Sequence, residues 1–541
     1  MSAELRQKNL NQFESECFDT LIIGGGINGA VSAAAASAKG ARVALVERSD
    51  FSSCSSSNSS NLAWGGIKYL ENGELMLVSK LCRSRNHLMR HYPSSVKEIR
   101  FFTTIKKGFR MPTFFVFLGS VFYWLMGACF TKAPRYLSLR RIKNEEPVIN
   151  TEGVAGGLEY SDCYLPDNDS RFVFRFIRKA MEKGCVAANY VEAKKSVFDN
   201  GVWITQVEDR KSGDVFAIRS KSIVNACGPF VDQYNAINGR ETSHQHVFSK
   251  GVHLIVDKIT NHERILAFFA SDGRLFFVIP MGPKTCIGTT DTPVENPISK
   301  VTEEDRQFIL GNANHLLNLK KELTVNDIVS ERCGVRPLAI ELGDDGEADW
   351  IHLSRKHAID VDKKENFISI FGGKLTDCVN VGEEVVSILK EMNLDVPFDD
   401  DAALWYGEPS AALKKAFMSL ASEYNIDSRV DTLSGEPLSE RIWRRYGELA
   451  NGLLEKIKND PKALEKPIEE IEYTRCELEL MAETEMIITL DDFLRRRSKV
   501  SLVLKKETLM SNSGLEELCT ILFGEKANEK YEEYRQKISR R

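Results

Sequence analysis

Residues 20–30 read TLIIGGGINGA, and residues 41–47 read ARVALVE. The first stretch predicts a short buried strand that ends in a glycine turn, because a β-branched and apolar run precedes three glycines. The Ala- and Ser-rich residues between the two stretches predict a helix, and the second stretch predicts another buried strand. Strand, helix and strand in this order predict a βαβ unit over residues 18–48 that opens a parallel sheet.

Three glycines of this unit, Gly24, Gly26 and Gly29, have the G-x-G-x-x-G spacing. In such a motif the first glycine makes a tight turn, the second lets the backbone approach a pyrophosphate, and the third lets helix and strand pack closely. The N-terminus of the helix presents unpaired N–H groups to the phosphates. Glu47 ends the second strand, where its carboxylate can accept both hydroxyls of an adenosine ribose. The unit is therefore predicted to bind a dinucleotide, with a ligand-free glycine turn as the alternative.

The composition is that of an ordinary globular protein. A chain of 541 residues is too long for one hydrophobic core and predicts about two to four domains. Lys and Arg total 72 and Asp and Glu total 77, so the net charge of −5 predicts no nucleic-acid partner. Twelve cysteines are scattered without a C-x-x-C pair, which predicts reduced thiols, no metal site and a cytoplasmic protein. The polar N-terminus carries acids, so neither a secretory signal nor a mitochondrial presequence is expected.

Changes in composition also divide the rest of the chain into segments of different predicted structure. The Ser-rich run at 52–61 is typical of a flexible linker, but it leads into a Gly-Gly turn and so favours close packing of backbone against a cofactor. Strand and loop signals alternate over residues 150–400, including a hairpin at 273–290. From about residue 405 the sequence changes to amphipathic, charged helices, which predicts an all-α C-terminal domain.

Residues 111–130 read MPTFFVFLGSVFYWLMGACF and contain no charged side chain, although basic residues flank them on both sides. The run just reaches the roughly 20 apolar residues of a membrane-spanning helix. A single span, however, would interrupt a continuous domain. An aromatic, cation-flanked segment that lies in the membrane interface is favoured. A buried helix or hydrophobic lid is the other alternative.

Several separated motifs together resemble the FAD-dependent glycerol-3-phosphate dehydrogenases, in the glycine-oxidase-like branch of flavoproteins. The resemblance runs from about residue 18 to about residue 500, and its most specific part is the C-terminal run LDDFLRRR. The motifs are IGGGINGA (23–30), GGIKYLE (65–71), DSR (169–171), NACGP (225–229), KGVH (250–253), IGTTD (287–291), GVRPL (334–338), FGGKLT (371–376) and TLDDFLRRR (489–497).

The resemblance implies an α/β plus α+β fold, with a Rossmann-like FAD-binding domain, an antiparallel-sheet substrate domain and an all-α C-terminal domain. The FAD-binding and substrate domains would be interleaved within residues 18–400, because the chain returns twice to the nucleotide-binding sheet. The implied segments are 18–100, 165–245 and 355–395 for the FAD-binding domain, 100–165 and 245–355 for the substrate domain, and 401–541 for the helical domain.

The resemblance also implies that FAD is the cofactor and that sn-glycerol 3-phosphate is oxidised to dihydroxyacetone phosphate. The substrate C–H beside a hydroxyl would give hydride to flavin N5 while a base takes the hydroxyl proton. The electrons would pass to a membrane quinone or another acceptor. The protein would then be cytoplasmic, with peripheral contact to the inner face of the cytoplasmic membrane through residues 111–130.

Family motifs also imply the site residues. His253, Arg336 and Lys374 would be catalytic, as general base, substrate anchor and cation at the flavin edge. Lys68 and Arg355 would bind substrate together with Arg336, since cations in fixed geometry suit a phosphate. From the residues alone, a structural histidine is favoured at position 253, and the motif reverses this preference. A surface salt bridge is the alternative for Arg336. The implied cofactor-binding residues are Gly24, Gly26, Ile27, Asn28, Gly29, Glu47, Ser60, Gly65, Gly66, Val186, Ala226, Gly228, Gly373, Lys374, Leu375 and Thr376.

Two departures from the family pattern affect the substrate. Lys68 stands where the family has an arginine that contacts the substrate phosphate, and lysine keeps the charge but lacks the bidentate fork. Trp64 replaces a histidine near the flavin and cannot transfer a proton. Two alternatives therefore stay open: a related FAD enzyme acting on another hydroxy or amino acid, and a flavin-binding protein without turnover.

Overall fold

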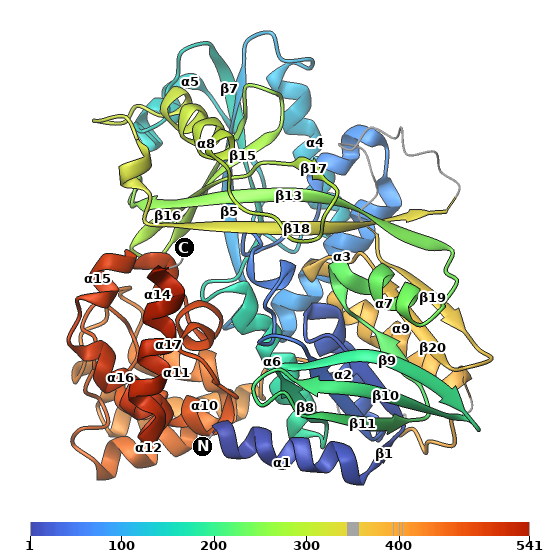
Figure 1. Ribbon diagram of the computed structural model, residues 1–541. Coiled ribbons are helices and arrows are strands. Elements are labelled where there is room, and N and C mark those ends of the chain that lie inside the picture. Colours follow the sequence, from blue (N-terminus) through green and yellow to red (C-terminus); the bar gives the residue numbers. More distant parts are fainter. Residues whose placement is uncertain (1, 343–355, 393, 400, 403, 540–541) are drawn as a thin grey trace.

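The predicted βαβ unit forms the centre of a six-stranded sheet (Figure 1). The computed structural model describes residues 2–342, 356–392, 394–399, 401–402 and 404–539. Strands run parallel in this sheet except at one edge, where β19 pairs antiparallel with β20. The strand order is β19 (Ala358–Asp362), β20 (Phe367–Phe371), β12 (Ile223–Asn225), β2 (Thr20–Ile23), β3 (Val43–Glu47) and β8 (Val186–Asn189).

Alternation along β2 gives each face of this sheet its own core. Ile22 packs into a cluster with helix α2 (Ile27–Ala38), α6 (Asp169–Glu182) and α9 (Cys378–Glu391) on one face. Leu21 and Ile23 point the other way, toward Trp203 of a four-stranded sheet. Successive strand residues face opposite sides of the sheet, so both faces of this continuous apolar strand are covered by other elements. The small sheet contains β1 (Cys17–Phe18), β11 (Val215–Ser220), β10 (Val202–Asp209) and β9 (Val191–Asp199).

A third, ten-stranded sheet lies beside the first and carries the predicted hairpin as β15 and β16 (Figure 1). Its longest pairing joins β13 and β18 from His244–Glu341 to Ile255–Ser330. Every pairing is antiparallel except that of β14 with β5. The strands are β17 (Thr292–Val294), β13 (His244–Asp257), β16 (Lys284–Gly288), β15 (Leu275–Met281), β14 (Ile265–Phe269), β5 (Lys97–Lys106), β7 (Val154–Tyr164) and β4 (Leu62–Ala63), with β18 (Ser330–Glu341) and β6 (Arg135–Leu137) at its flanks.

Helix α4 (Thr113–Met126) occupies most of the uncharged segment. Phe114, Phe115, Leu118, Phe122 and Leu125 are exposed on it, so it is not the buried helix of the third alternative. Its other face contacts β7, α3 (Leu75–His91) and the turn before α3. Among the residues that the structure describes, no helix has both the length and the apolar character needed to cross a membrane.

The C-terminal region is helical as predicted, and between residues 404 and 539 none of the described residues lies in a strand. It has its own hydrophobic core and contacts α6 and strand β18 of the ten-stranded sheet (Figure 1). One π-helical turn, Asp492–Arg497, coincides with the run LDDFLRRR. The helices are α10 (Ala411–Glu423), α11 (Leu438–Tyr446), α12 (Ala450–Asn459), α13 (Arg475–Thr484), α14 (Val500–Val503), α15 (Lys506–Met510), α16 (Gly514–Phe523) and α17 (Ala527–Ser539).

Candidate active site

Steric contacts require glycine at two positions of the turn after β2 and the start of α2. Gly24 has φ of +108°, and a Cβ there would lie 2.4 Å from the carbonyl oxygen of Ala226 on the neighbouring strand end. A Cβ on Gly29 would lie 1.9 Å from the carbonyl oxygen of Gly24. Only glycine fits at either position. The turn therefore brings the N-terminus of α2 against the sheet, as the motif predicts.

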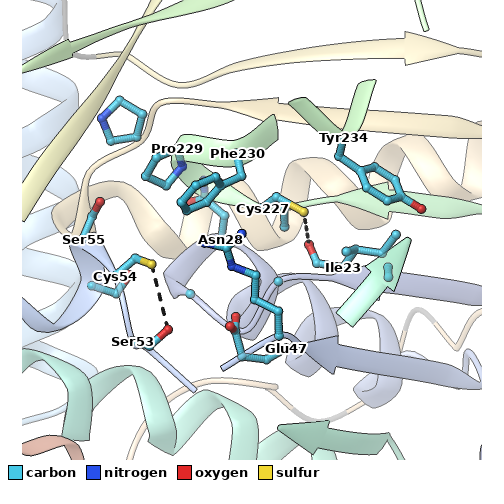
Figure 2. A pocket seen from close by; sticks show the side chains of 18 of the residues that line it. Ile23, Asn28, Glu47, Ser53, Cys54, Ser55, Cys227, Pro229, Phe230 and Tyr234 are labelled. Carbon is cyan, nitrogen blue, oxygen red and sulfur yellow. Dashed lines mark hydrogen bonds between the residues drawn. The ribbon is translucent and has the colours of Figure 1, made fainter. Parts of the chain in front are cut away.

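A cavity of about 180 Å³ opens at the carboxyl ends of β2, β3 and β12. Gly24, Gly26, Asn28 and Glu47 line it together with Ala226, Gly228 and Phe230, as Figure 2 shows for those it labels. Such a crevice at the strand ends is where doubly wound folds bind nucleotides. The Glu47 carboxylate accepts the N–H of Gly25 at 2.8 Å and that of Ser49 at 2.9 Å, and burial raises its pKa. These bonds hold the carboxylate at the pocket wall.

A second cavity, of about 310 Å³, shares Ile27, Ser55, Ser56, Pro337 and Gly373 with the first, so the two adjoin. The Ser-rich run is thus part of the wall and not a linker. The second cavity is lined by all three predicted catalytic side chains and by several predicted cofactor contacts, namely Ser60, His253, Arg336, Lys374, Leu375 and Thr376.

The Gly372–Gly373 turn joins the two cavities. Gly372 has φ of +62° and Gly373 of +108°, and a Cβ on Gly373 would lie 3.0 Å from the side-chain oxygen of Asn28. The Asn28 amide donates to the Gly372 carbonyl at 3.0 Å, which fixes the turn on the first residues of α2. Lys374 places its ammonium 4.1 Å from the centre of the Tyr69 ring. A 3-10 turn, Leu375–Asp377, follows, and α9 begins at Cys378.

His253 is fully enclosed by the second cavity's walls. Its Nε2 lies 2.9 Å from the Ser60 hydroxyl, whereas its Nδ1 is buried without a hydrogen-bond partner. Burial, together with the positive charges of Arg332 and Arg336, lowers the pKa of His253 to about 3. The imidazole is therefore neutral at physiological pH, and it becomes an effective base only where a further negative charge raises this pKa. Buried polar atoms usually have a hydrogen-bond partner, so the unpartnered Nδ1 favours contact with a ligand.

Arg336 stands between the second cavity and a third, smaller one of about 100 Å³. Its guanidinium forms a half-buried ion pair with Asp291 at 3.0 Å and donates to the Thr289 hydroxyl at 3.2 Å. Lys68 and Arg274 also line the third cavity. Sequence reasoning missed Arg274, whose guanidinium is fixed by the Asp291 carbonyl at 2.8 Å and by Asp272. Three cations and the Asp291 carboxylate thus surround one small compartment.

Four predicted cofactor contacts lie outside the walls of these cavities. Gly29 packs against Gly24, while a Cβ on Gly65 or Gly66 would meet Tyr123 or Tyr69. Val186 lies inside β8, and the first cavity is lined by Val191, Glu192 and Ala193 of the next strand instead. Val186 begins β8 opposite Ala44, whereas Asn189 at the other end of the strand lies opposite Glu47 of the pocket wall, so Val186 is at the end of the strand away from the pocket. Arg355, the remaining predicted substrate contact, lies outside the described residues.

The loop that carries Ser60 is anchored by charged residues to which sequence reasoning gave no role. Arg332, which is fully buried, donates to the Ser59 carbonyl at 2.7 Å, and Asp169 accepts the Ser59 N–H at 2.8 Å. Arg495 of the helical region donates to the Asn58 side chain at 3.1 Å. Asp169 and Arg495 belong to motifs that marked the family, which was the available signal. No motif pointed to Arg332, and its only signal in the sequence was that it is a charged residue within a strand.

Comparison with known families gives two matches along the chain. Residues 19–372 match the family described as FAD dependent oxidoreductase, and residues 407–522 match the C-terminal domain of alpha-glycerophosphate oxidase. The aerobic glycerol-3-phosphate dehydrogenase of Staphylococcus haemolyticus is 30% identical over 96% of this chain and 93% of its own length. That of Bacillus subtilis is 31% identical over 71% of this chain and 69% of its own length.

Solved structures share the fold. A glycerol-3-phosphate dehydrogenase from Bacillus halodurans complexed with FAD superposes with a TM-score of 0.72 at 23% identity, covering 99% of this chain and 97% of that one. An L-alpha-glycerophosphate oxidase from Mycoplasma pneumoniae with FAD bound gives a TM-score of 0.55 at 16% identity, covering 72% and 97%.

Proposed function

The chain belongs to the FAD-dependent oxidoreductase family, with the aerobic glycerol-3-phosphate dehydrogenases as relatives, and we propose that it oxidises sn-glycerol 3-phosphate to dihydroxyacetone phosphate. The observation that carries this proposal is the cluster of Lys68, Arg274 and Arg336 around a compartment of about 100 Å³ that adjoins the neutral His253.

FAD is the cofactor of this enzyme, and the residues present fit it. The two joined cavities offer a glycine cradle at Gly24 at one end and the unpartnered His253 Nδ1 at the other. Glu47, Gly26 and Asn28 would hold the nucleotide half, and Ser60, Gly373 and Thr376 the flavin half. When bound, the flavin supplies a two-electron acceptor for hydride.

The protein's own contribution is positioning and charge. A phosphate dianion in the third cavity is matched by Lys68, Arg274 and Arg336, because arginine forks and lysine donors suit phosphate oxygens. The reacting carbon then lies on the His253 side of Arg336. His253 is neutral there and takes the hydroxyl proton. Negative charge brought by the phosphate opposes the two arginines that lower its pKa, which strengthens the base when substrate is bound.

We further propose that the electrons leave to a quinone in the cytoplasmic membrane, with the protein docked peripherally on its inner face. Support comes from α4 and its neighbours, which expose Phe114, Phe115, Leu118, Phe122 and Leu125 on one side. Aromatic and aliphatic side chains of this kind, flanked by Lys and Arg, favour the membrane interface. An exposed apolar face formed by five neighbouring side chains is typical of an interaction site.

One observation favours a second candidate function. Lys68 supplies a single point charge where a bidentate arginine occurs in the family, and Trp64, which lines both the second and third cavities, cannot transfer a proton. Either change would suit a related FAD enzyme with another hydroxy or amino acid as substrate.

Anaerobic reduction of the flavin separates these functions. We expect sn-glycerol 3-phosphate to bleach the visible flavin band of the purified protein. Bleaching only by another hydroxy or amino acid would move the assignment to the second candidate, and bleaching by none would indicate a flavin-binding protein without turnover. Arg336→Ala should raise KM or abolish reduction while FAD stays bound. Loss of FAD from this variant would contradict the role given to Arg336.

A further inference from the structure

Two arginines from separate parts of the chain meet behind the wall of the second cavity. Asn58, Ser59 and Ser60 form this stretch of the wall. Arg332 of β18 donates to the Ser59 carbonyl at 2.7 Å, and Arg495 of the π-helical turn donates to the Asn58 side chain at 3.1 Å. Each guanidinium is therefore one residue away from the space proposed for the flavin half of FAD.

The positive charge behind this wall is only partly balanced. Arg332 is fully buried and contacts the Asp169 carboxylate at 3.3 Å, and the same carboxylate accepts the Ser59 N–H. Among the residues that the structure describes, no carboxylate forms an ion pair with Arg495, whose other hydrogen bond goes to the Glu331 carbonyl at 3.3 Å. The two cations thus have one contacting carboxylate between them.

The effect of this charge is visible in two pKa values. Burial and the positive charge of Arg332 lower the pKa of Arg495 to about 9, which leaves its guanidinium charged at neutral pH. Burial and the charges of Arg332 and Arg336 lower the pKa of His253, which lines the second cavity. Buried charges are screened much less than charges in water. The two arginines therefore make the electrostatic potential in the second cavity more positive.

We propose that Arg332 and Arg495 are positioning residues that act on the flavin through charge: they stabilise the negative charge that the ring carries after reduction. Reduction by hydride adds negative charge, and fixed cations stabilise such charge best where water is excluded. Asp169 acts in the opposite direction, because its carboxylate offsets part of the charge. The proposal rests on the flavin half of FAD lying beside Ser60, and it does not depend on which substrate supplies the hydride.

The signs of two substitutions separate this electrostatic role from mechanical support of the loop. Arg495→Met removes a cation and keeps an unbranched side chain, so the reduced flavin should become less stable. Asp169→Asn removes an anion and keeps an amide oxygen that can accept the Ser59 N–H, so the reduced flavin should become more stable. Loosening of the loop would instead shift both variants in the same direction. Arg495→Lys keeps the charge and is the conservative variant.

Arg178→Met controls for the loss of a cation elsewhere in the same pair of domains. Arg178 lies in α6, is partly buried, and donates to the Arg445 carbonyl at 3.2 Å. Burial lowers its pKa to about 10, so its guanidinium resembles that of Arg495. It does not belong to the lining of the three cavities described above.

Two measurements on the FAD-loaded protein test the proposal without substrate. One is the Kd of sulfite, which adds to oxidised flavin and leaves negative charge on the ring. The other is the midpoint potential of the flavin, measured by equilibration with a reference dye. In Arg495→Met we expect sulfite to bind at least tenfold more weakly, and the two-electron equilibrium to shift at least tenfold toward oxidised flavin, which is about 30 mV. Asp169→Asn should shift both quantities the other way, while Arg495→Lys and Arg178→Met should stay within threefold of the wild type.

Three results would overturn the proposal. Arg495→Met could stay within threefold of the wild type in both measurements, or Asp169→Asn could shift the potential in the same direction as Arg495→Met. Arg495→Met could also fail to hold FAD at a saturating concentration, which would make Arg495 a support of the cofactor site alone. If Asp169→Asn does not fold, the comparison of Arg495→Met with Arg495→Lys and Arg178→Met decides the question. Failure of glycerol 3-phosphate to bleach the flavin would refute the substrate assignment alone, because neither measurement uses that substrate.

Discussion

Gly373→Ala tests whether the Gly372–Gly373 turn binds the cofactor. The substitution forces a side chain onto a residue with φ of +108° and puts its Cβ 3.0 Å from the Asn28 side-chain oxygen. Strain of this kind costs about 1–3 kcal/mol. Displacing Asn28 also breaks its 3.0 Å hydrogen bond to the Gly372 carbonyl, a loss of roughly 0.5–1.5 kcal/mol.

These costs should appear in the affinity for FAD. In the apoprotein the substituted turn can relax to negative φ, and FAD binding then has to restore the native conformation. A total of about 2–4 kcal/mol corresponds to a Kd raised roughly 30-fold to several hundredfold, at 1.4 kcal/mol per factor of ten. The assay is titration of apoprotein with FAD, followed by quenching of flavin fluorescence.

Gly201→Ala provides the control. Gly201 has φ of +83° in the turn between β9 and β10, and a Cβ there would meet nothing within 4 Å. It therefore reproduces the backbone strain without touching the cavities. Gly201→Ala should lower the free energy of unfolding and leave the Kd for FAD unchanged. If Gly373→Ala also bound FAD within twofold of the wild type, the turn would not be a cofactor contact and the reasoning would be refuted.

Three further predictions concern buried charges. Asp50→Asn removes the buried carboxylate that Arg496 and Arg497 share, while Arg496 keeps Asp492, so urea unfolding should show a loss of about 3–5 kcal/mol. Tyr123→Phe removes a 2.6 Å hydrogen bond to the fully buried Asp162 and should lower the unfolding free energy by about 1–3 kcal/mol in thermal melts. Although burial opposes it, hydrogen bonds to two carboxylates, Asp377 among them, raise the pKa of His357 from 6.5 to about 9. The stability advantage of the wild type over His357→Gln should therefore be greatest below pH 6.5 and disappear as the pH rises through about 9.

Each of these predictions has a contradicting outcome. Asp50→Asn with wild-type stability would mean that the charges at the motif are satisfied by water. Tyr136→Phe, at an exposed position, should be neutral, and an equal loss there would remove the significance of the Tyr123 result. A stability difference at His357 that grows from pH 6.5 to 9 would have the wrong sign for a histidine with a raised pKa.

Local patterns in the sequence were sufficient for the parts of the fold that depend on short-range chemistry. The run TLII and its glycines specify a strand and turn within a few residues, and the structure has both. Helix α1 (Ser2–Ser15) was missed because its sequence is polar. It is held by long-range contacts, such as Arg6 to the carboxylate of Asp209 at 2.6 Å. No pattern within a window of ten residues reports a partner that distant.

The same distinction applies to the candidate active site: some of its residues belong to local motifs, and others are placed by the tertiary structure. His253, Arg336 and Lys374 were placed from motifs, and the structure brings them to one cavity. Arg274 could not be recognised, because it reaches the substrate compartment from a hairpin turn whose sequence is that of an ordinary turn. Val186 does not line the cavities, because it begins β8 opposite Ala44, at the end of the strand away from the pocket, and the sequence does not show this register.

The contact between the C-terminal motif and the Ser-rich loop has a consequence for biosynthesis. Arg496 and Arg497 bind Asp50, and Arg495 binds Asn58, across more than 430 positions of the chain. The Ser-rich loop therefore cannot be anchored during synthesis until residue 497 has emerged from the ribosome, long after the last described strand, β20, has been made. Until then the nascent chain has all of its described strands but lacks the contacts that hold this loop, and incompletely packed chains of this kind are prone to aggregation.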